Sequence, residues 1–235
     1  MEAPRRGNGA DFNPDAPYRM YHGERIPGFP QHPHRGFETI TATITGTIDH
    51  SDSQGNAGRY GGGDLQWMTA GKGVVHGEMF PLIEQEEDNP CKFFQLWINL
   101  PARSKMVDPS FKMHWAEQVP HVRSASGDTD VTVWAGSIGD VTALAPPPHS
   151  WASDPANEVA VLLIKVAPGS KYTLPAAAHG TEIARSLYWV EGDALTVGGE
   201  KVAHAKPVRI DVRADADASL SVPMAASGEA LVLVL

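Results

Sequence analysis

The feature that most constrains the fold is an alternation of polar and apolar residues early in the chain. Every second residue from Thr39 to Thr47 is threonine, and the residues between and after them are Ile40, Ala42, Ile44, Gly46 and Ile48. Side chains on a β-strand point alternately to the two faces of a sheet, so this period of two predicts a strand. We expect its threonine face to be polar and its other face to be buried. The turn-forming sequence SDSQGNAG over 51–58 is expected to fold this strand back.

The rest of the chain consists of short apolar segments separated by turn residues, without a long helical period. Further strands are predicted over 65–68, 74–80, 93–100, 132–135, 158–166, 187–190, 195–197, 208–212 and 231–235. The 23 glycines and 19 prolines are widely spread, which suits turns between strands. Many short strands of this kind favour an all-β sandwich or barrel. We predict two similar β halves, 1–125 and 126–235, with residues 1–30 as an irregular lead-in.

Composition and charge argue against several classes of protein. With 235 residues, 42% of them hydrophobic, the chain is globular and holds one large domain or two small ones. The 19 basic and 28 acidic residues give a net charge of −9, which opposes nonspecific binding to nucleic acid. Cys91 is the single cysteine, so an internal disulfide framework is excluded. The longest apolar stretch, 159–167, is too short to span a membrane, and the first residues lack the apolar core of a secretory signal, so we expect a soluble cytoplasmic protein.

Two short segments carry the residues best suited to chemistry. In HPHRGFE, over 32–38, His32 and His34 lie two residues apart and so share one face of a strand, with the parity of Ile40 on the expected buried face. In GVVHGE, over 73–78, His76 and Glu78 have the same spacing. A buried histidine pair is costly unless it is hydrogen-bonded or ligated. Three neutral imidazoles and one carboxylate suit a first-row divalent metal and leave two octahedral positions open.

A simpler interpretation stays open for each motif. A single His-x-His pair in a strand is more often an accident of surface or core than a metal site, and it is the second pair, in another strand, that favours the metal. Glu38 shares the parity of the first histidine pair and is a rival carboxylate ligand. The other histidines form no such pairs, so we expect them on the surface or in ordinary hydrogen bonds: His22, His50, His114, His121, His149, His179 and His204.

These segments resemble the cupin motifs, in which a glycine-rich lead, His-x-His and a later Glu are followed by a Gly before a third His. The finer resemblance is to the pirin family. Its hallmark stretches are similar to HPHRGFET over 32–39, QWMTAG over 66–71, GVVHGEM over 73–79 and QLWINLP over 95–101. The resemblance covers about residues 20–115, and the second half matches in layout only.

The resemblance implies an all-β bicupin in which two β-barrels face each other and the N-terminal barrel, 1–125, holds one metal ion. It implies His32, His34, His76 and Glu78 as the metal ligands, with Glu38 beside them rather than on the metal. Iron, as Fe(II), is the metal that it implies, and nickel, manganese, copper and zinc are alternatives for such ligands.

The second barrel, 126–235, departs from this pattern. It has no His-x-His pair, and His179 stands alone near the place where a cupin would carry ligands, so we expect no metal there. Pirins usually have a longer N-terminal β segment and continue past a strand such as 231–235, so we expect a barrel that is cut short at its end.

The implied activity is that of an Fe(II)-dependent quercetin 2,3-dioxygenase, which cleaves a flavonol with O2. The substrate's 3-hydroxyl would bind the metal and Glu78 would accept its proton as general base, while the metal acts as Lewis acid. The apolar neighbours of the motifs would line a pocket or simply pack in the core: Phe37, Met68, Phe94 and Trp97.

Two other functions stay open. Animal pirins are described as nuclear proteins that modulate transcription factors, which implies a non-enzymatic, iron-dependent regulator that binds protein partners. The acidic segment EQEED over 84–88 would join such a surface or form a solvated loop. No basic run interleaves with aromatic residues, so direct binding of nucleic acid is not expected. The third possibility is a structural module that holds metal without turnover. We expect a monomer, cytoplasmic or, in a eukaryote, nuclear.

Overall fold

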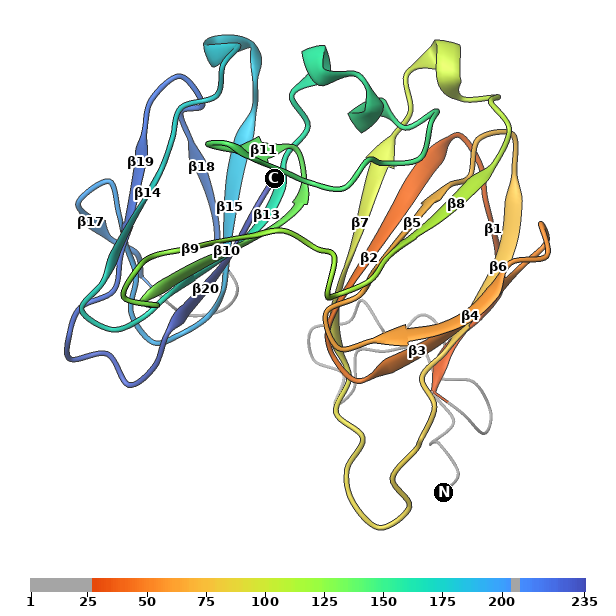
Figure 1. The fold of residues 1–235 in the computed structure, drawn as a ribbon, viewed down its shortest axis with the longest axis horizontal. Coiled ribbons are helices and arrows are strands. Elements are labelled where there is room, and N and C mark those ends of the chain that lie inside the picture. The colour runs from red at the N-terminus through yellow and green to blue at the C-terminus, as the bar shows by residue number, and fades with distance from the viewer. Residues whose placement is uncertain (1–26, 204–207) are drawn as a thin grey trace. The chain divides into compact units, whose positions relative to one another are not determined.

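The computed structural model describes residues 27–203 and 208–235, and the chain divides into two compact units. The described residues up to 117, together with 146–151, form the first unit. Those of 118–145 and 152–235 form the second. Nearly all regular structure is β-strand, with single 3-10 turns between strands (Figure 1). Within the described part of the chain, no helix is long and apolar enough to cross a membrane.

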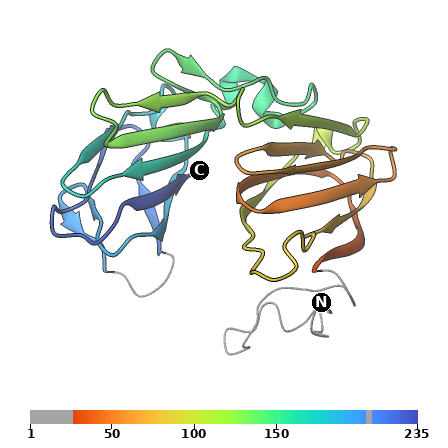
Figure 2. The same cartoon turned by 60° about the horizontal axis from the view of Figure 1, so that its bottom comes forward.

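The first unit contains two four-stranded antiparallel sheets, which lie face to face as seen in Figures 1 and 2. One sheet has the order β1-β6-β3-β4 and contains β1 (Gly28–His34), β3 (Thr47–Asp52), β4 (Ala57–Gly61) and β6 (Val74–Met79). The other has the order β7-β2-β5-β8 and contains β2 (Phe37–Thr45), β5 (Leu65–Thr69), β7 (Lys92–Asn99) and β8 (Ser110–His114). A 3-10 turn, η2 (Ala102–Ser104), follows β7. The strands predicted over 65–68, 74–80 and 93–100 are confirmed.

The start of β1 corrects the expected lead-in. Residues 1–26 of that lead-in lie outside the described residues, but Gly28 already begins a strand that includes His32. Pro33 lies within this strand and has no N–H to donate to a neighbour. It is tolerated because β1 is the edge strand of its sheet.

The alternating threonine segment forms two strands rather than one. Gly46 separates them with a φ of +85°, and a Cβ atom there would lie 2.5 Å from the carbonyl oxygen of Pro90, so only glycine fits. The break sends β2 into one sheet and β3 into the other. The predicted turn then follows over 53–56, and β3 and β4 pair as a hairpin with Ser51 opposite Ala57.

Both faces of β2 are buried, so the threonine face is polar as expected but does not meet solvent. The exposed fraction is 1% for each of Thr39, Thr41 and Thr43. Thr41 lies opposite Gln95 on β7, and Gln95 in turn reaches Glu78 on the other sheet. The threonine face is therefore the polar lining of the space between the two sheets.

The second unit contains a six-stranded sheet of order β18-β15-β20-β13-β10-β9, a four-stranded sheet of order β14-β19-β16-β17 and the hairpin β11-β12. The larger sheet contains β9 (His121–Arg123), β10 (Thr129–Ala135), β13 (Val161–Val166), β15 (Arg185–Glu191), β18 (Val208–Val212) and β20 (Ala230–Val234). The other strands are β11 (Ser137–Ile138), β12 (Val141–Thr142), β14 (Lys171–Leu174), β16 (Thr196–Val197), β17 (Glu200–Lys201) and β19 (Ala218–Ser221). The 3-10 turns η4 (Pro155–Asn157) and η5 (Gly180–Glu182) lie between strands of this unit. A further turn, η3 (Trp151–Ser153), begins at the last residue of the first unit's segment 146–151. The predicted strands are confirmed here with ends shifted by a few residues.

The core of the second unit is apolar. One cluster of buried side chains gathers residues from both of its main sheets, including Val131, Ile164, Leu174, Leu187, Trp189, Leu220 and Val232. Each of these side chains is 1% exposed or less. The hydrophobic side chains of alternating strand positions thus fill this unit, as expected for two packed sheets.

Candidate metal centre

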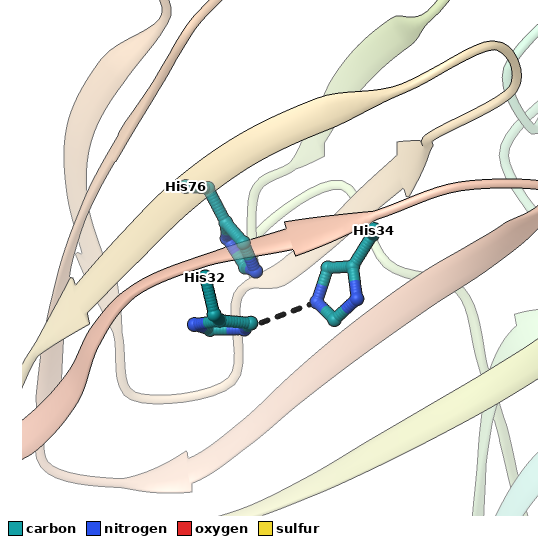
Figure 3. Close-up of side chains that lie close together, drawn as sticks. All are labelled: His32, His34 and His76. Carbon is teal, nitrogen blue, oxygen red and sulfur yellow. Dashed lines mark hydrogen bonds between the residues drawn. The ribbon is translucent and has the colours of Figure 1, made fainter.

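Three imidazole rings converge in the first unit, two from β1 and one from β6 (Figure 3). The two strands pair antiparallel with His32 opposite His76. The ring centroids of His34 lie 4.7 Å from those of His32 and of His76, and the His32 and His76 centroids lie 4.4 Å apart. Each residue offers one ring nitrogen, and the three nitrogens lie within 4.8 Å of one another. The structure therefore brings together the three histidines of the two sequence motifs.

His76 also belongs to a second group, with His50 on β3 and Glu78 on β6, in which the possible ligand atoms again lie within 4.8 Å. This group forms because β3 pairs with β6 so that His50 lies opposite Glu78. All three side chains are buried. His50 is a site residue that the paired motifs do not reveal. The signal that could have found it is its parity with Ile48, which is buried on the same strand.

Glu38 lies elsewhere, although the sequence offers it as a rival ligand. Its Oε1 accepts hydrogen bonds from Trp67 Nε1 at 3.3 Å and from Thr69 Oγ1 at 2.6 Å. Its Oε2 accepts from Ser150 Oγ at 2.9 Å and from the Trp151 backbone N–H at 3.2 Å. Four donors thus satisfy this buried carboxylate, which belongs to neither histidine group.

Glu38 lies away from the histidines because the alternation of side-chain direction cannot be counted across Gly36. This residue has a φ of +76° and separates β1 from β2, which then join different sheets. Along β2, Glu38 and Thr41 lie an odd number of residues apart with no bulge between them, so their side chains point to opposite faces. Because Thr41 faces the space between the sheets, Glu38 faces away from it.

The apolar neighbours divide between the two faces of the sheet. The ring of Phe37 lies 4.7 Å from that of His34 and 4.9 Å from that of Trp97, which is 65% exposed. Met68 is buried in a small cluster with Ala70 and Val74. Phe94 lies opposite Ala42, on the outer face of β2 with Glu38. Phe37 and Trp97 are thus the two of these four side chains whose rings contact His34.

Burial keeps His34 and His76 neutral and favours protonation of the Glu78 carboxyl group. The pKa of His34 is lowered to about 4 by burial and by the charge of His32. The pKa of His76 is lowered to about 3 by burial and then by the neighbouring imidazoles. Burial raises the pKa of Glu78 to about 7, against a hydrogen bond from Gln95 that lowers it. His34 and His76 are thus neutral nitrogen donors beside a carboxyl group that titrates near neutral pH.

The ring nitrogens suit a metal ion better than they suit one another. His32 Nδ1 lies 2.7 Å from the carbonyl oxygen of Pro30, which can only accept, so the proton of a neutral His32 is on Nδ1 and its Nε2 is a lone-pair donor. That Nε2 lies 3.1 Å from Nε2 of His34. Nε2 of His76 is buried and has no hydrogen-bond partner among the described residues. Buried polar atoms rarely lack a partner. Three imidazoles and a carboxylate that leave positions open suit a divalent transition metal.

The two β units, each made of packed antiparallel sheets, define a bicupin. The family model described as Pirin matches residues 10–98. The pirin-like protein of Caulobacter vibrioides is 43% identical over 116 residues, which make up 49% of this chain and 40% of that protein. The pirin of Homo sapiens is 33% identical over 184 residues, 78% of this chain and 57% of that protein. The chain belongs to the pirin family, and it spans about half the length of these relatives.

A solved structure resembles the whole fold. The quercetin 2,3-dioxygenase from Acinetobacter baumannii is 30% identical, with a TM-score of 0.75, and the superposition covers 96% of this chain and 76% of that one. The all-β bicupin class expected from the sequence is confirmed by this similarity and by the strand content.

Proposed function

We propose that the first unit binds one divalent metal ion through His32, His34, His76 and Glu78, and that the protein is an Fe(II)-dependent dioxygenase of the quercetin 2,3-dioxygenase type. The observation that carries the proposal is the convergence of three imidazole rings, in which the buried Nε2 of His76 has no hydrogen-bond partner among the described residues. The similarity to the quercetin 2,3-dioxygenase supports the activity. Iron fits a site of imidazoles and carboxylate with open positions, which nickel, manganese, copper and zinc can also occupy.

The protein's own residues would bind and deprotonate the substrate. A carboxyl group with a pKa of about 7 can take a proton from a flavonol 3-hydroxyl at neutral pH, so Glu78 is the general base. Gln95 Nε2 donates to Glu78 Oε2 at 3.1 Å and holds the carboxylate in place. The ring of Trp97, beside His34, is an exposed surface for an aromatic substrate. A bound ion supplies Lewis-acid polarisation of the substrate oxygen and a template for O2.

The test is metal analysis of protein purified without chelator, followed by anaerobic loading with Fe(II) and measurement of O2 uptake with quercetin. We expect about one metal ion per chain and substrate-dependent uptake. His76→Ala should remove both. His179→Ala is the matched control, because His179 pairs with a carboxylate, Glu158, at 2.8 Å but lies exposed in the second unit.

The outcomes separate the functions. Stoichiometric metal without O2 uptake would reject the dioxygenase and favour the iron-dependent regulatory protein or a structural module. Redox-dependent capture of a protein partner would then distinguish these two. Protein that takes up no metal under any loading would contradict all three.

A further inference from the structure

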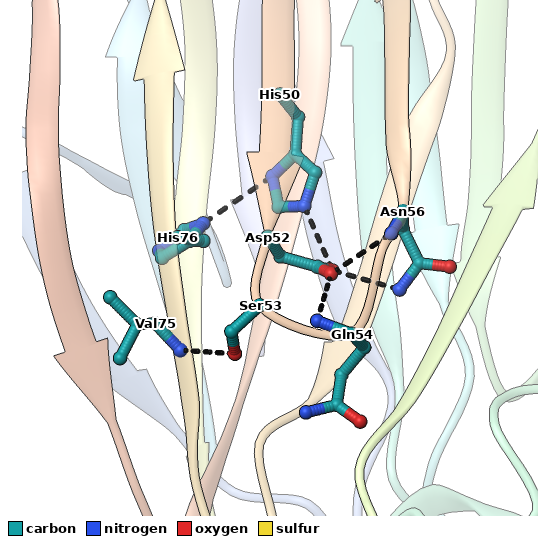
Figure 4. Close-up of polar contacts among 7 residues, drawn as sticks. All are labelled: His50, Asp52, Ser53, Gln54, Asn56, Val75 and His76. Carbon is teal, nitrogen blue, oxygen red and sulfur yellow. Dashed lines mark hydrogen bonds and ion pairs between the residues drawn. The ribbon is translucent and has the colours of Figure 1, made fainter.

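A carboxylate next to the histidine cluster is held in one position by the turn between β3 and β4 (Figure 4). Asp52 Oδ1 accepts the backbone N–H of Gln54 at 2.8 Å and that of Asn56 at 3.1 Å. Its Oδ2 accepts Nδ2 of Asn56 at 2.9 Å and lies 3.2 Å from Nε2 of His50. The side chains of Asp52 and His50 are 1% and 0% exposed. An aspartate that caps its own turn in this way has little freedom to move.

The hydrogen bonds of Asp52 show how it can meet His50. Three N–H donors, two from the turn backbone and one from the Asn56 side chain, point at the carboxylate and stabilise its ionised form. The fourth contact of the carboxylate is Nε2 of His50, at 3.2 Å.

Hydrogen-bond chemistry then fixes the proton on each ring in turn. An ionised carboxylate only accepts, so His50 must carry its proton on Nε2, facing Asp52. Nδ1 of a neutral His50 is then an acceptor, and it lies 3.3 Å from Nδ1 of His76. His76 must therefore carry its proton on Nδ1. Its Nε2, which is buried and has no hydrogen-bond partner in the described part of the chain, is left with its lone pair free.

His32 also has its proton on Nδ1, and here a single backbone contact is sufficient. His32 donates its Nδ1 proton to the carbonyl oxygen of Pro30 and so also leaves Nε2 free. Ligating histidines commonly donate their second nitrogen to a carbonyl or carboxylate, which fixes the tautomer of the ring. His76 has such a carboxylate, Asp52, but the imidazole of His50 lies between the two.

We propose that Asp52 and His50 form a relay that sets the position of the proton on His76, so that the Nε2 lone pair is available to the metal. Both are positioning residues, acting through His76 rather than on the metal or substrate. The inference rests on the proposed metal site for its purpose, but the tautomer it assigns is a property of the metal-free protein.

The direct test is long-range 1H–15N correlation NMR of the metal-free protein labelled with 15N-histidine, near neutral pH. We expect His76 to carry its proton on Nδ1 and His50 on Nε2, with signals assigned by their loss in His76→Gln and His50→Gln. A proton on Nε2 of His76 in the wild-type protein would overturn the relay.

The matching variant is Asp52→Asn. An amide NH2 facing His50 would require Nε2 of His50 to accept, which moves the His50 proton to Nδ1 and forces the His76 proton onto Nε2. Affinity for Zn(II), measured by competition with a chelator, should fall by about 10- to 100-fold although every proposed ligand is intact. The His76 NMR signal should change tautomer in the same variant.

Asp64→Asn is the control. The Asp64 carboxylate accepts the backbone N–H of Gly61 and of Ala116, both at 2.9 Å, in another turn of the same unit. This variant should keep wild-type Zn(II) affinity and tautomers. Unchanged affinity and tautomers in Asp52→Asn would contradict the relay. So would a loss of affinity in His50→Phe that Asp52→Asn does not share, because His50 would then act as a ligand itself. Wild-type protein that binds no metal would instead reject the proposed function, and the metal-free spectrum would still decide the relay.

Discussion

The two units share an architecture of packed antiparallel sheets but fill the space between the sheets differently. In the second unit that space holds an apolar cluster around Trp189 and Ile164. In the first unit it also holds threonine, glutamine, histidine and glutamate side chains beside a smaller apolar cluster around Ile48, and Thr41, Gln66, His76 and Glu78 are at most 2% exposed. Burying polar groups costs free energy unless they are hydrogen-bonded or ligated. One fold can therefore serve as a stabilising core or as a binding site, depending on which residues face inward.

The largest effect should come from the apolar core. Trp189 is fully buried in the second unit, and Trp189→Ala should lower the free energy of unfolding by about 3–5 kcal/mol through lost burial and a cavity. Urea denaturation measures this. Trp97→Ala in the first unit is the matched control, because Trp97 is 65% exposed, and it should cost about 0.5–1 kcal/mol. Equal losses in the two variants would contradict the assignment of stability to the second unit's core.

Two buried glutamates should behave in opposite ways. Glu38→Gln places an NH2 group among four donors and should lower the free energy of unfolding by about 1–3 kcal/mol, with metal affinity unchanged. Glu78→Gln should cost little stability, because burial already disfavours its charge, and should weaken metal binding at least about tenfold. Chemical denaturation and chelator competition measure the two effects. Weaker metal binding in Glu38→Gln would restore Glu38 as a ligand.

Acid should destabilise the metal-free protein through the first unit. Unfolded histidine has a pKa near 6.5, whereas His34 and His76 have pKa values of about 4 and about 3 when folded. Between about pH 4.5 and 6.5 the unfolded chain therefore binds more protons at these residues, so stability rises with pH. Glu78, with a folded pKa of about 7, binds its proton more tightly when folded and so lowers stability as pH rises, but it is one group against two.

We expect a gain of about 1 kcal/mol per pH unit for each net proton, measured by urea denaturation at several pH values. Glu78→Gln should steepen the rise, since it removes the opposing group. A stability that falls from pH 4.5 to 6.5 would mean that these histidines are not buried in the neutral form.

The smallest effect should come from the glutamines that line the first unit. Gln95→Leu removes a hydrogen bond that lowers the pKa of Glu78, so metal affinity at pH 7 should fall several-fold and recover at higher pH. Gln66→Leu is the comparison, because Nε2 of Gln66 is buried without a partner among the described residues. It should leave metal affinity unchanged and increase stability. Equal losses of affinity would show that general polarity of the interior, not the Gln95 contact, supports Glu78.

Local patterns predicted the strands well, because β-branched and alternating segments are direct signals of extended backbone. The two-residue spacing of the His-x-His and His-x-Glu motifs also indicated that His32, His34 and His76 lie close together. The prediction of which face of the sheet each side chain occupies was wrong for Glu38. Gly36 and Gly46 adopt positive φ, and each ends one strand and starts another in a different sheet, so parity cannot be counted across them.

Contacts between segments far apart in the chain could not be predicted from the sequence, for a different reason. His50 and Asp52 meet His76 only through the register of β3 with β6, which no local pattern encodes. The Pro-rich segment 146–151 supplies half of the hydrogen bonds to Glu38, and no local sequence pattern indicates this contact. Such long-range pairings depend on topology rather than on composition.

That last contact has a consequence for how the protein is made. Ser150 and Trp151 follow Glu38 by 112 and 113 residues, whereas β8, the last strand of the first unit, ends at His114. A ribosome that adds about 5–20 residues per second therefore completes all the strands of this unit some seconds before Glu38 receives its last two donors. During that interval the carboxylate on the outer face of β2 has donors for Oε1 but lacks those that Ser150 and Trp151 give to Oε2. The first unit is thus the first to be translated but cannot finish folding until part of the second has left the ribosome.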